Sequence, residues 1–192
     1  MSETGNENIF LRGGNNGEIV FKEFVDDDED FATYLSWLRN IKLIEMIGRQ
    51  EYLLAMDIDQ IRLYVKNLNL SENDSFFKVY YEETFIGTFK VGHIDWRLGS
   101  ADLGIMIGDS NFQKKGLSTK IMQLGIEYSF GTLGLRRLTG GCYVDNAAMC
   151  RCFEACGFQL EGRRREAVTL GDRYTDHMLY GLLKKDMQND KL

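Results

Sequence analysis

The chain has 192 residues, of which 44% are hydrophobic, so it is long and apolar enough to bury one large core. Its formal net charge of −6 leaves no basic stripe, which excludes nucleic acid as the main partner. No apolar run has the length of a membrane span, and the first eight residues are too polar for a signal peptide. We therefore expect a cytoplasmic protein with no membrane partner.

The first third of the chain predicts a tail, a hairpin and two helices. Residues 1–8 predict a disordered tail, and residues 9–12 and 18–25 flank a Gly/Asn-rich turn, as in a hairpin or an added edge strand. The acidic run 26–30 precedes a helix whose N-terminus carboxylates favour, and we prefer this interpretation to a metal site. The core positions of this helix are Phe31, Tyr34, Leu35 and Leu38. A second helix is expected over residues 57–68, with Ile58, Ile61, Val65 and Leu68 on one face.

Alternation and helical periodicity predict the other elements in chain order. They are two antiparallel strands joined through Glu82 and Glu83, a strand, a long helix, a strand, a helix closed by Gly157, and two long strands. Their expected ranges are 75–82, 84–95, 100–109, 117–130, 137–144, 147–156, 158–169 and 173–183. No repeat or linker interrupts them, so the sequence predicts one α+β domain.

The four cysteines match no zinc site. They are Cys142, Cys150, Cys152 and Cys156, and neither their spacing nor the two isolated histidines complete a metal-ligand pattern. We expect small buried thiols in a reducing compartment and no metal.

The connection between the 100–109 strand and the 117–130 helix has the composition of a phosphate-binding loop. It runs from Gln113 to Ser118 and contains Lys114, Lys115 and Gly116. Free backbone N–H groups at a helix start, together with two lysines, suit phosphate oxygens. A simple strand-to-helix connection is the alternative.

Three motifs together resemble the GNAT acyltransferase superfamily. Gln113-x-x-Gly116-x-Ser118 resembles its Gln/Arg-x-x-Gly-x-Gly/Ala signature, and the segment from Asn146 to Gly157-Phe158 resembles its Asn-rich helix. Residues 160–163 and 174–176 look like its ribosomal-protein N-terminal acetyltransferase branch. The resemblance covers residues 18–185. It implies one N-acetyltransferase domain over residues 9–192, with a mixed central sheet of about seven strands and about four helices.

The resemblance also implies acetyl-coenzyme A as co-substrate. The pyrophosphate would lie at the loop and the pantetheine arm along the strand, where that strand diverges from the 137–144 strand. The cofactor-binding residues would be Ile105, Met106, Ile107, Gln113, Lys114, Lys115, Gly116, Leu117, Ser118, Thr119 and Asn146. Asn146 could equally cap the following helix.

Acetyl transfer to an amine needs a base, because a protonated amine is no nucleophile. Asp102 lies eleven residues before Gln113, the spacing of the base in the histone-acetylating relatives, and is our first choice. His93 and Asp95 are the reserve. Phe153 stands where many GNAT enzymes carry the tyrosine that protonates the leaving thiolate, so Tyr174, Tyr143 or water would serve, or the thiolate departs unaided.

The acceptor is expected to be a primary amine, on a small molecule or a peptide. By resemblance, its contacts would come from the first two helices and the segment between them: Trp37, Arg39, Asn40, Arg49 and Tyr52. We favour an amino sugar on a nucleotide carrier, with a protein N-terminus as the alternative. A non-catalytic acyl-coenzyme A sensor is the competing class, and a homodimer stays open.

Overall fold

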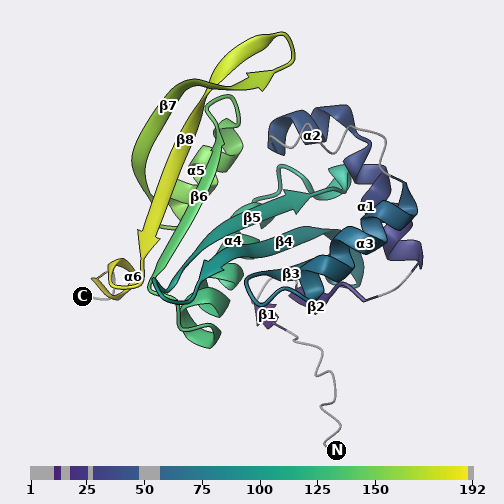
Figure 1. Cartoon of the computed structure of the whole chain (residues 1–192), viewed down its shortest axis with the longest axis horizontal. Helices are drawn as coiled ribbons and strands as arrows, with labels where there is room; N and C mark the ends of the chain where they lie inside the picture. The colour runs from purple at the N-terminus through teal and green to yellow at the C-terminus, as the bar shows by residue number, and fades with distance from the viewer. Residues whose placement is uncertain (1–10, 14–17, 26–27, 48–56, 190–192) are drawn as a thin grey trace, which may run out of the picture.

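The computed structural model describes residues 11–13, 18–25, 28–47 and 57–189, and their strands form one mixed eight-stranded sheet (Figure 1). The strand order is β1-β2-β3-β4-β5-β6-β8-β7. The strands are β1 Leu11–Gly13, β2 Ile19–Glu23, β3 Ser75–Tyr81, β4 Thr84–Asp95, β5 Ser100–Ile107, β6 Arg137–Tyr143, β7 Gln159–Leu170 and β8 Arg173–Leu183. All neighbours pair antiparallel except β5 and β6, which are parallel. The expected α+β fold with a mixed sheet is confirmed, and the three-residue β1 adds one edge strand to the seven.

The helices follow the predicted order with additions. They are α1 Asp28–Leu38, α2 Ile41–Ile47, α3 Ile58–Asn69, α4 Leu117–Glu127, α5 Ala147–Ala155 and α6 Asp186–Asn189. Helix α4 continues into a π-helical turn, Tyr128–Thr132, before the chain enters β6. Asp57 caps α3 in a capping box with Gln60, which fixes the start of this helix where the sequence predicts it.

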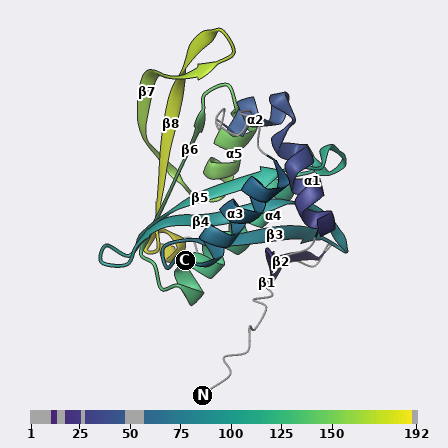
Figure 2. The same ribbon diagram turned by 45° about the vertical axis from the view of Figure 1, so that its right-hand side comes forward.

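Two apolar clusters hold the layers together. Helices α4 and α5 pack with β3–β6 and β8 in the larger cluster, which includes Phe89, Leu103 and Phe153. Helices α1 and α3 pack with Phe24 and Phe76 in the second cluster. All four core positions predicted for α1 are buried there. Figures 1 and 2 show α1 and α3 beside the β2–β4 end and the β7–β8 hairpin at the other end, and α2 reaches from α1 toward β6 and α5.

Three local expectations are corrected. No helix was predicted in the segment between the first two helices, but its described part contains α2, whose start Asn40 marks by accepting from the Leu43 N–H at 3.4 Å. Asp30 lies in the first turn of α1, as expected of an N-terminal acid, yet it is buried against the Lys78 ammonium and 3.0 Å from the Tyr80 hydroxyl. A short α6 follows the last strand.

Strands β5 and β6 pair over only three residues each, and this divergence positions the site. The parallel register joins Ser100, Ala101 and Asp102 to Arg137, Leu138 and Thr139. Beyond this point, no pairing joins the described residues 103–107 to residues 140–143, and Figure 1 shows the two strands diverging. A parallel pair that stops midway leaves a backbone edge on each strand facing the gap.

Some expectations fall outside the described part of the chain. The tail of residues 1–8 and the acceptor candidates Arg49 and Tyr52 lie there. Among the described helices, none is both long and apolar enough to cross a membrane.

Candidate active site

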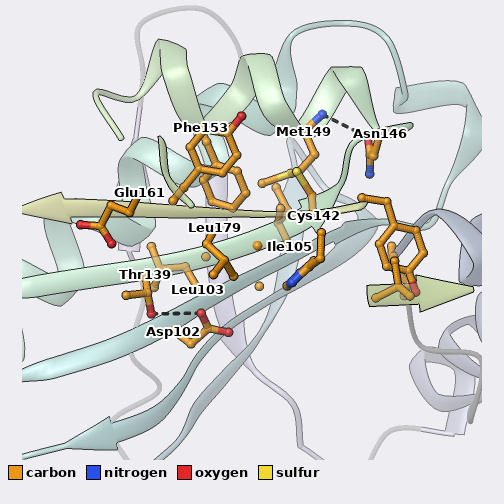
Figure 3. Close-up of a pocket in the computed structure, with 18 of the residues that line it drawn as sticks. Asp102, Leu103, Ile105, Thr139, Cys142, Asn146, Met149, Phe153, Glu161 and Leu179 are labelled. Atoms are coloured by element: carbon orange, nitrogen blue, oxygen red, sulfur yellow. Dashed lines mark hydrogen bonds between the residues drawn. The ribbon is translucent and has the colours of Figure 1, made fainter. Parts of the chain in front are cut away.

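A cavity of about 620 Å³ lies where β5 and β6 diverge. Residues of β5, β6, β7, β8 and α5 line it, and Met46 and Ile47 of α2 reach its rim. Figure 3 shows Phe153 and Met149 descending from α5 on one side and Asp102 and Thr139 on the other.

Strand alternation gives the cavity two chemically different walls. The wall toward α5 is apolar and consists of Leu103, Ile105, Gly140, Cys142, Met149 and Phe153. The opposite wall is polar and consists of Asp102, Arg137, Thr139, Tyr143, Glu161, Arg164 and His177, with Leu179 between them. A thioester with an apolar arm suits the first wall, and a charged acceptor suits the second.

Asp102, the predicted base, lies on the polar wall. Its Oδ1 is 3.1 Å from the Thr139 hydroxyl, and the same hydroxyl is 3.2 Å from the Ala101 carbonyl oxygen. Because Asp102 and Thr139 are the last paired residues of β5 and β6, the carboxylate stands where the cavity opens. Its half-burial keeps it accessible to an amine or to one water.

His177 on β8 was not found from the sequence. Its ring lies over the backbone of Gly141, where an added Cβ would come within 2.6 Å of Nε2, and the ring meets Tyr143 edge-on at 6.4 Å. Burial and the nearby Arg164 lower the pKa of His177 below 6.5, although Asp102 raises it in part. The imidazole is therefore neutral near pH 7 and can accept a proton. The alternation of residues 173–183 already placed position 177 on the same strand face as Leu179. This pattern could have identified His177 as a candidate.

Glu161 and Arg137, also missed, join β7 to β6 across the polar wall. Arg137 Nη1 donates to Glu161 Oε1 at 2.8 Å, and Nη2 donates to the other oxygen. The hydrogen bonds from Arg137 lower the pKa of the Glu161 carboxyl, and Glu161 raises the pKa of the guanidinium in return. The pair is charge-neutral as a unit, so it closes one side of the cavity without adding net charge.

The predicted phosphate loop has the backbone geometry of an anion site. Gly116 is the N-cap of α4 with φ of +75°, makes no side-chain cap, and has open space where a Cβ would lie. Lys114 also has a positive φ of 58°. Gln113 Nε2 donates to the Ile107 carbonyl at 2.9 Å, which ties the loop to the end of β5. The uncapped N–H groups of Leu117, Ser118 and Thr119 thus fit a pyrophosphate, with two exposed lysines beside them.

Strand β5, which was predicted to bind the pantetheine arm, offers mainly backbone groups for that contact. Ile105 and Ile107 are half-buried toward the α4–α5 cluster, whereas Met106 is buried in the opposite cluster against α1 and α3. Asn146 caps α5 by accepting from the Met149 N–H at 3.1 Å, and its Nδ2 donates to the Met46 carbonyl at 3.1 Å. The capping role is confirmed, while a contact with the arm stays a prediction.

Several predicted residues are not brought to the cavity. His93 is exposed, with φ of +53° at a bulge of β4, and neither it nor Asp95 lines the cavity. Tyr174 is 69% exposed near the turn of the β7–β8 hairpin. Trp37 packs against Phe85 and Gly108 in the second core cluster, so it is a core residue. Arg39 and Asn40 are exposed and do not line the cavity either.

With Tyr174 outside the cavity, two tyrosines that line it remain as possible proton donors to the leaving thiolate. Phe153 is 1% exposed and stacks on Tyr180 with ring centroids 5.0 Å apart. Tyr143 and Tyr180 both line the cavity, but the Tyr180 hydroxyl lies 3.3 Å from Glu154, and burial raises its pKa. Tyr143 is therefore the better placed of the two.

The cysteines behave as free thiols. Cys142 of the apolar wall has its Sγ 3.4 Å from that of Cys150, and no disulfide joins the described cysteines. Within the part of the chain that the structure describes, no group of three His, Cys, Asp or Glu side chains is arranged to hold a metal.

Known structures share this architecture. A spermidine N-acetyltransferase from Vibrio cholerae, solved with coenzyme A and spermine, superposes with a TM-score of 0.80 at 20% identity over 89% of this chain and 98% of that one. A ribosomal L7/L12 alpha-N-protein acetyltransferase solved with coenzyme A gives 0.79 at 17% identity over 91% and 98%. At such identities the likeness defines the fold, which is that of acetyltransferases.

The family follows from the sequence. The model of the acetyltransferase (GNAT) domain matches residues 19–159, so the chain belongs to the GNAT acetyltransferase family. An uncharacterized N-acetyltransferase, p20 of Bacillus licheniformis, is 28% identical over 130 residues, which are 67% of this chain and 72% of that protein. The resemblance to GNAT enzymes is confirmed, and the protein is an acyltransferase.

Proposed function

We propose that the protein transfers an acetyl group from acetyl-coenzyme A to a primary amine by direct attack, in the cavity between β5 and β6. One observation carries the proposal: the divergence of these strands gathers an open backbone edge and Asp102 with His177 around one cavity, and Gln113 ties the loop at Gly116 to the end of the same strand. Direct attack needs the thioester and the amine in contact, and the two walls meet along β5.

The co-substrate is held mainly by backbone. The start of α4 and its two lysines bind the pyrophosphate, and the free edge of β5 hydrogen-bonds the pantetheine amides. Backbone N–H groups near Ile105–Ile107 stabilise the oxyanion that develops on the thioester carbonyl. Phe153 and Met149 pack on the apolar part of the arm.

The polar wall removes the proton from the acceptor. An alkyl ammonium has a pKa near 10, so only a small fraction is nucleophilic at neutral pH without a base. Asp102 accepts this proton, directly or through one water, and the neutral His177 offers a second acceptor on the same wall. Tyr143 or water returns a proton to the thiolate, since Phe153 cannot.

The acceptor proposed is an amino sugar on a nucleotide carrier, with a protein N-terminus as the alternative. The similar structures do not agree on an acceptor, because one is a spermidine enzyme and the other acts on a ribosomal protein. Besides Asp102 and the neutral Arg137–Glu161 pair, the polar wall carries Arg164, and this cation favours an acceptor with negative charge over a polyamine. We also propose that residues 9–192 form one domain and that the protein is a cytoplasmic homodimer.

The test is release of free thiol from acetyl-coenzyme A with three amines: a nucleotide-linked amino sugar, a peptide with a free N-terminus, and spermidine. We expect release with the amino sugar, and none without an amine. Acetyl-coenzyme A binding is measured on the same sample by calorimetry. Tight binding with no release from any amine would favour the acyl-coenzyme A sensor, and no binding would contradict both classes.

A further inference from the structure

We infer that the polar wall contains a subsite for an anionic group, with Arg164 as its ligand, so the acceptor is an amine that carries a phosphate several bonds from the nitrogen. The inference deepens the proposed function and rests on it for the position of the amine.

Of the two arginines that line the cavity, Arg164 is the one without a carboxylate partner among the described residues. On β6, β7 and β8, Arg137 pairs with Glu161, Arg163 with Asp176, and Arg173 with Asp145. The Arg164 guanidinium lines the cavity but makes no hydrogen bond or ion pair with the side chain or backbone of another described residue. An unpaired guanidinium at a cavity wall suits a phosphate, which it can hold through two parallel hydrogen bonds.

Strand register aligns Arg164 with the proposed proton acceptors. Arg164 of β7 pairs with His177 of β8, and His177 pairs with Tyr143 of β6, so the three side chains form one row across the sheet. The next row holds Gly162, Leu179 and Gly141. The His177 ring covers Gly141 and Leu179 lies beside Gly162, so this row places no charged side chain between Arg164 and the row that holds Thr139 and Asp102.

The spacing of the rows selects the kind of acceptor. Thr139 and Tyr143 are four residues apart on β6, which separates their rows by about 13 Å along the strand. The lean of His177 over Gly141 and the length of the arginine side chain span part of this distance. A free α-amino acid, whose two charges are separated by two bonds, is too short to reach both ends. A sugar amine linked to a diphosphate has the required extent.

Electrostatics on this wall also disfavour a polyamine. Arg164 lies near enough to His177 to lower its pKa, and the same field opposes a second ammonium in the acceptor. Asp102 attracts the first ammonium and Arg164 a distant anion, so the wall is complementary to an amine with a remote negative charge.

The experiment compares glucosamine with UDP-glucosamine as acceptors at saturating acetyl-coenzyme A, for wild type, Arg164→Gln and Arg164→Lys. Arg165→Gln is the matched control, because Arg165 is the next residue of β7, is exposed, and does not line the cavity. A charge-assisted hydrogen bond predicts that Arg164→Gln raises the KM for UDP-glucosamine roughly 10–100-fold. The KM for glucosamine should stay unchanged, Arg164→Lys should raise the KM for UDP-glucosamine less, and Arg165→Gln should resemble wild type.

Several results would overturn the inference. They are equal KM values for the two sugars, a preference for spermidine, and an unchanged KM in Arg164→Gln. If Arg164→Gln raises the KM only for a peptide acceptor with acidic side chains, the subsite binds a peptide and not a phosphate. If no amine reacts, binding of UDP-glucosamine to the coenzyme A complex is measured by calorimetry. Binding that is lost in Arg164→Gln would support the subsite although the catalytic proposal fails. Absence of binding to wild type would reject the subsite.

Discussion

Gly116 has a left-handed backbone conformation, and the space where a side chain would lie is open. Its φ of +75° lies in the left-handed region, and no heavy atom lies within 4 Å of the position a Cβ would take. Packing therefore does not require glycine here, but the conformation favours it. The space above the backbone is where the proposed pyrophosphate approaches the first turn of α4.

We predict that Gly116→Val weakens coenzyme A binding at least about 10-fold while the fold persists, because its side chain occupies the space of a phosphate contact. Strain from a β-branched residue at this φ costs on the order of 1–3 kcal/mol of stability. Gly134→Val is the control, since Gly134 has φ of +68° and equally open space away from the loop. Calorimetry and thermal unfolding of both variants separate the effects. Equal affinity in the two variants would remove the loop from the site.

The ring of Phe153 is buried between Gly140 and Tyr180. An added Cβ on Gly140 would lie 2.5 Å from the ring, so the ring fills the space that the glycine leaves. We predict that Phe153→Tyr keeps kcat equal or higher, since it supplies an acid to the thiolate, and that Phe153→Leu costs little beyond packing. Thiol release measures both variants. A Tyr variant that binds acetyl-coenzyme A normally but turns over far more slowly would show that the shape of Phe153 matters to the site.

At the scale of elements, the β7–β8 hairpin is fastened by carboxylates. Arg173 and Thr175 donate to Asp145 and lower the pKa of its carboxyl, and the Glu166 N–H and then Arg163 do the same for Asp176. Arg137 lowers the pKa of Glu161. Because the hairpin carries His177 and Arg164, these contacts also position the polar wall.

The lowered pKa values give a sign for the pH dependence of stability. A carboxyl with a lowered folded pKa stabilises the fold above its unfolded value, here 3.8 for the aspartates and 4.5 for Glu161, and the contribution is lost as pH falls. We predict a melting temperature that starts to fall below about pH 6.5, where burial of His177 opposes its protonation in the fold, and falls more steeply below about pH 5, with a shallower acid limb for Asp145→Asn. Asp172→Asn, in the turn of the same hairpin and unpaired among the described residues, should follow wild type. Identical curves for Asp145→Asn and wild type would contradict this role.

At the scale of the whole molecule, local sequence pattern predicted most of the elements, although not the short helices α2 and α6, and it did not predict the polar wall. Alternation and capping signals located α3, the paired strands and the buried face of α1, because these depend on neighbours in sequence. Asp102, His177 and Arg164 come together only through the parallel β5–β6 register and the antiparallel β6–β8–β7 register, which join segments far apart in the chain. His93 was a candidate because it lies near the end of the strand before Asp102, but it is exposed at the bulge in β4, with φ of +53°.

The most direct test of the account is turnover against pH for Asp102→Asn at saturating acetyl-coenzyme A, with Asp59→Asn of the exposed α3 surface as control. Loss of a general base predicts a fall in kcat of roughly 10²–10⁴-fold at neutral pH. Affinity for acetyl-coenzyme A should barely change, and part of the rate should return as pH rises and the amine deprotonates unaided. Near-normal turnover of Asp102→Asn at neutral pH would contradict the account, and a large loss in His177→Gln alongside it would transfer the role of base to His177.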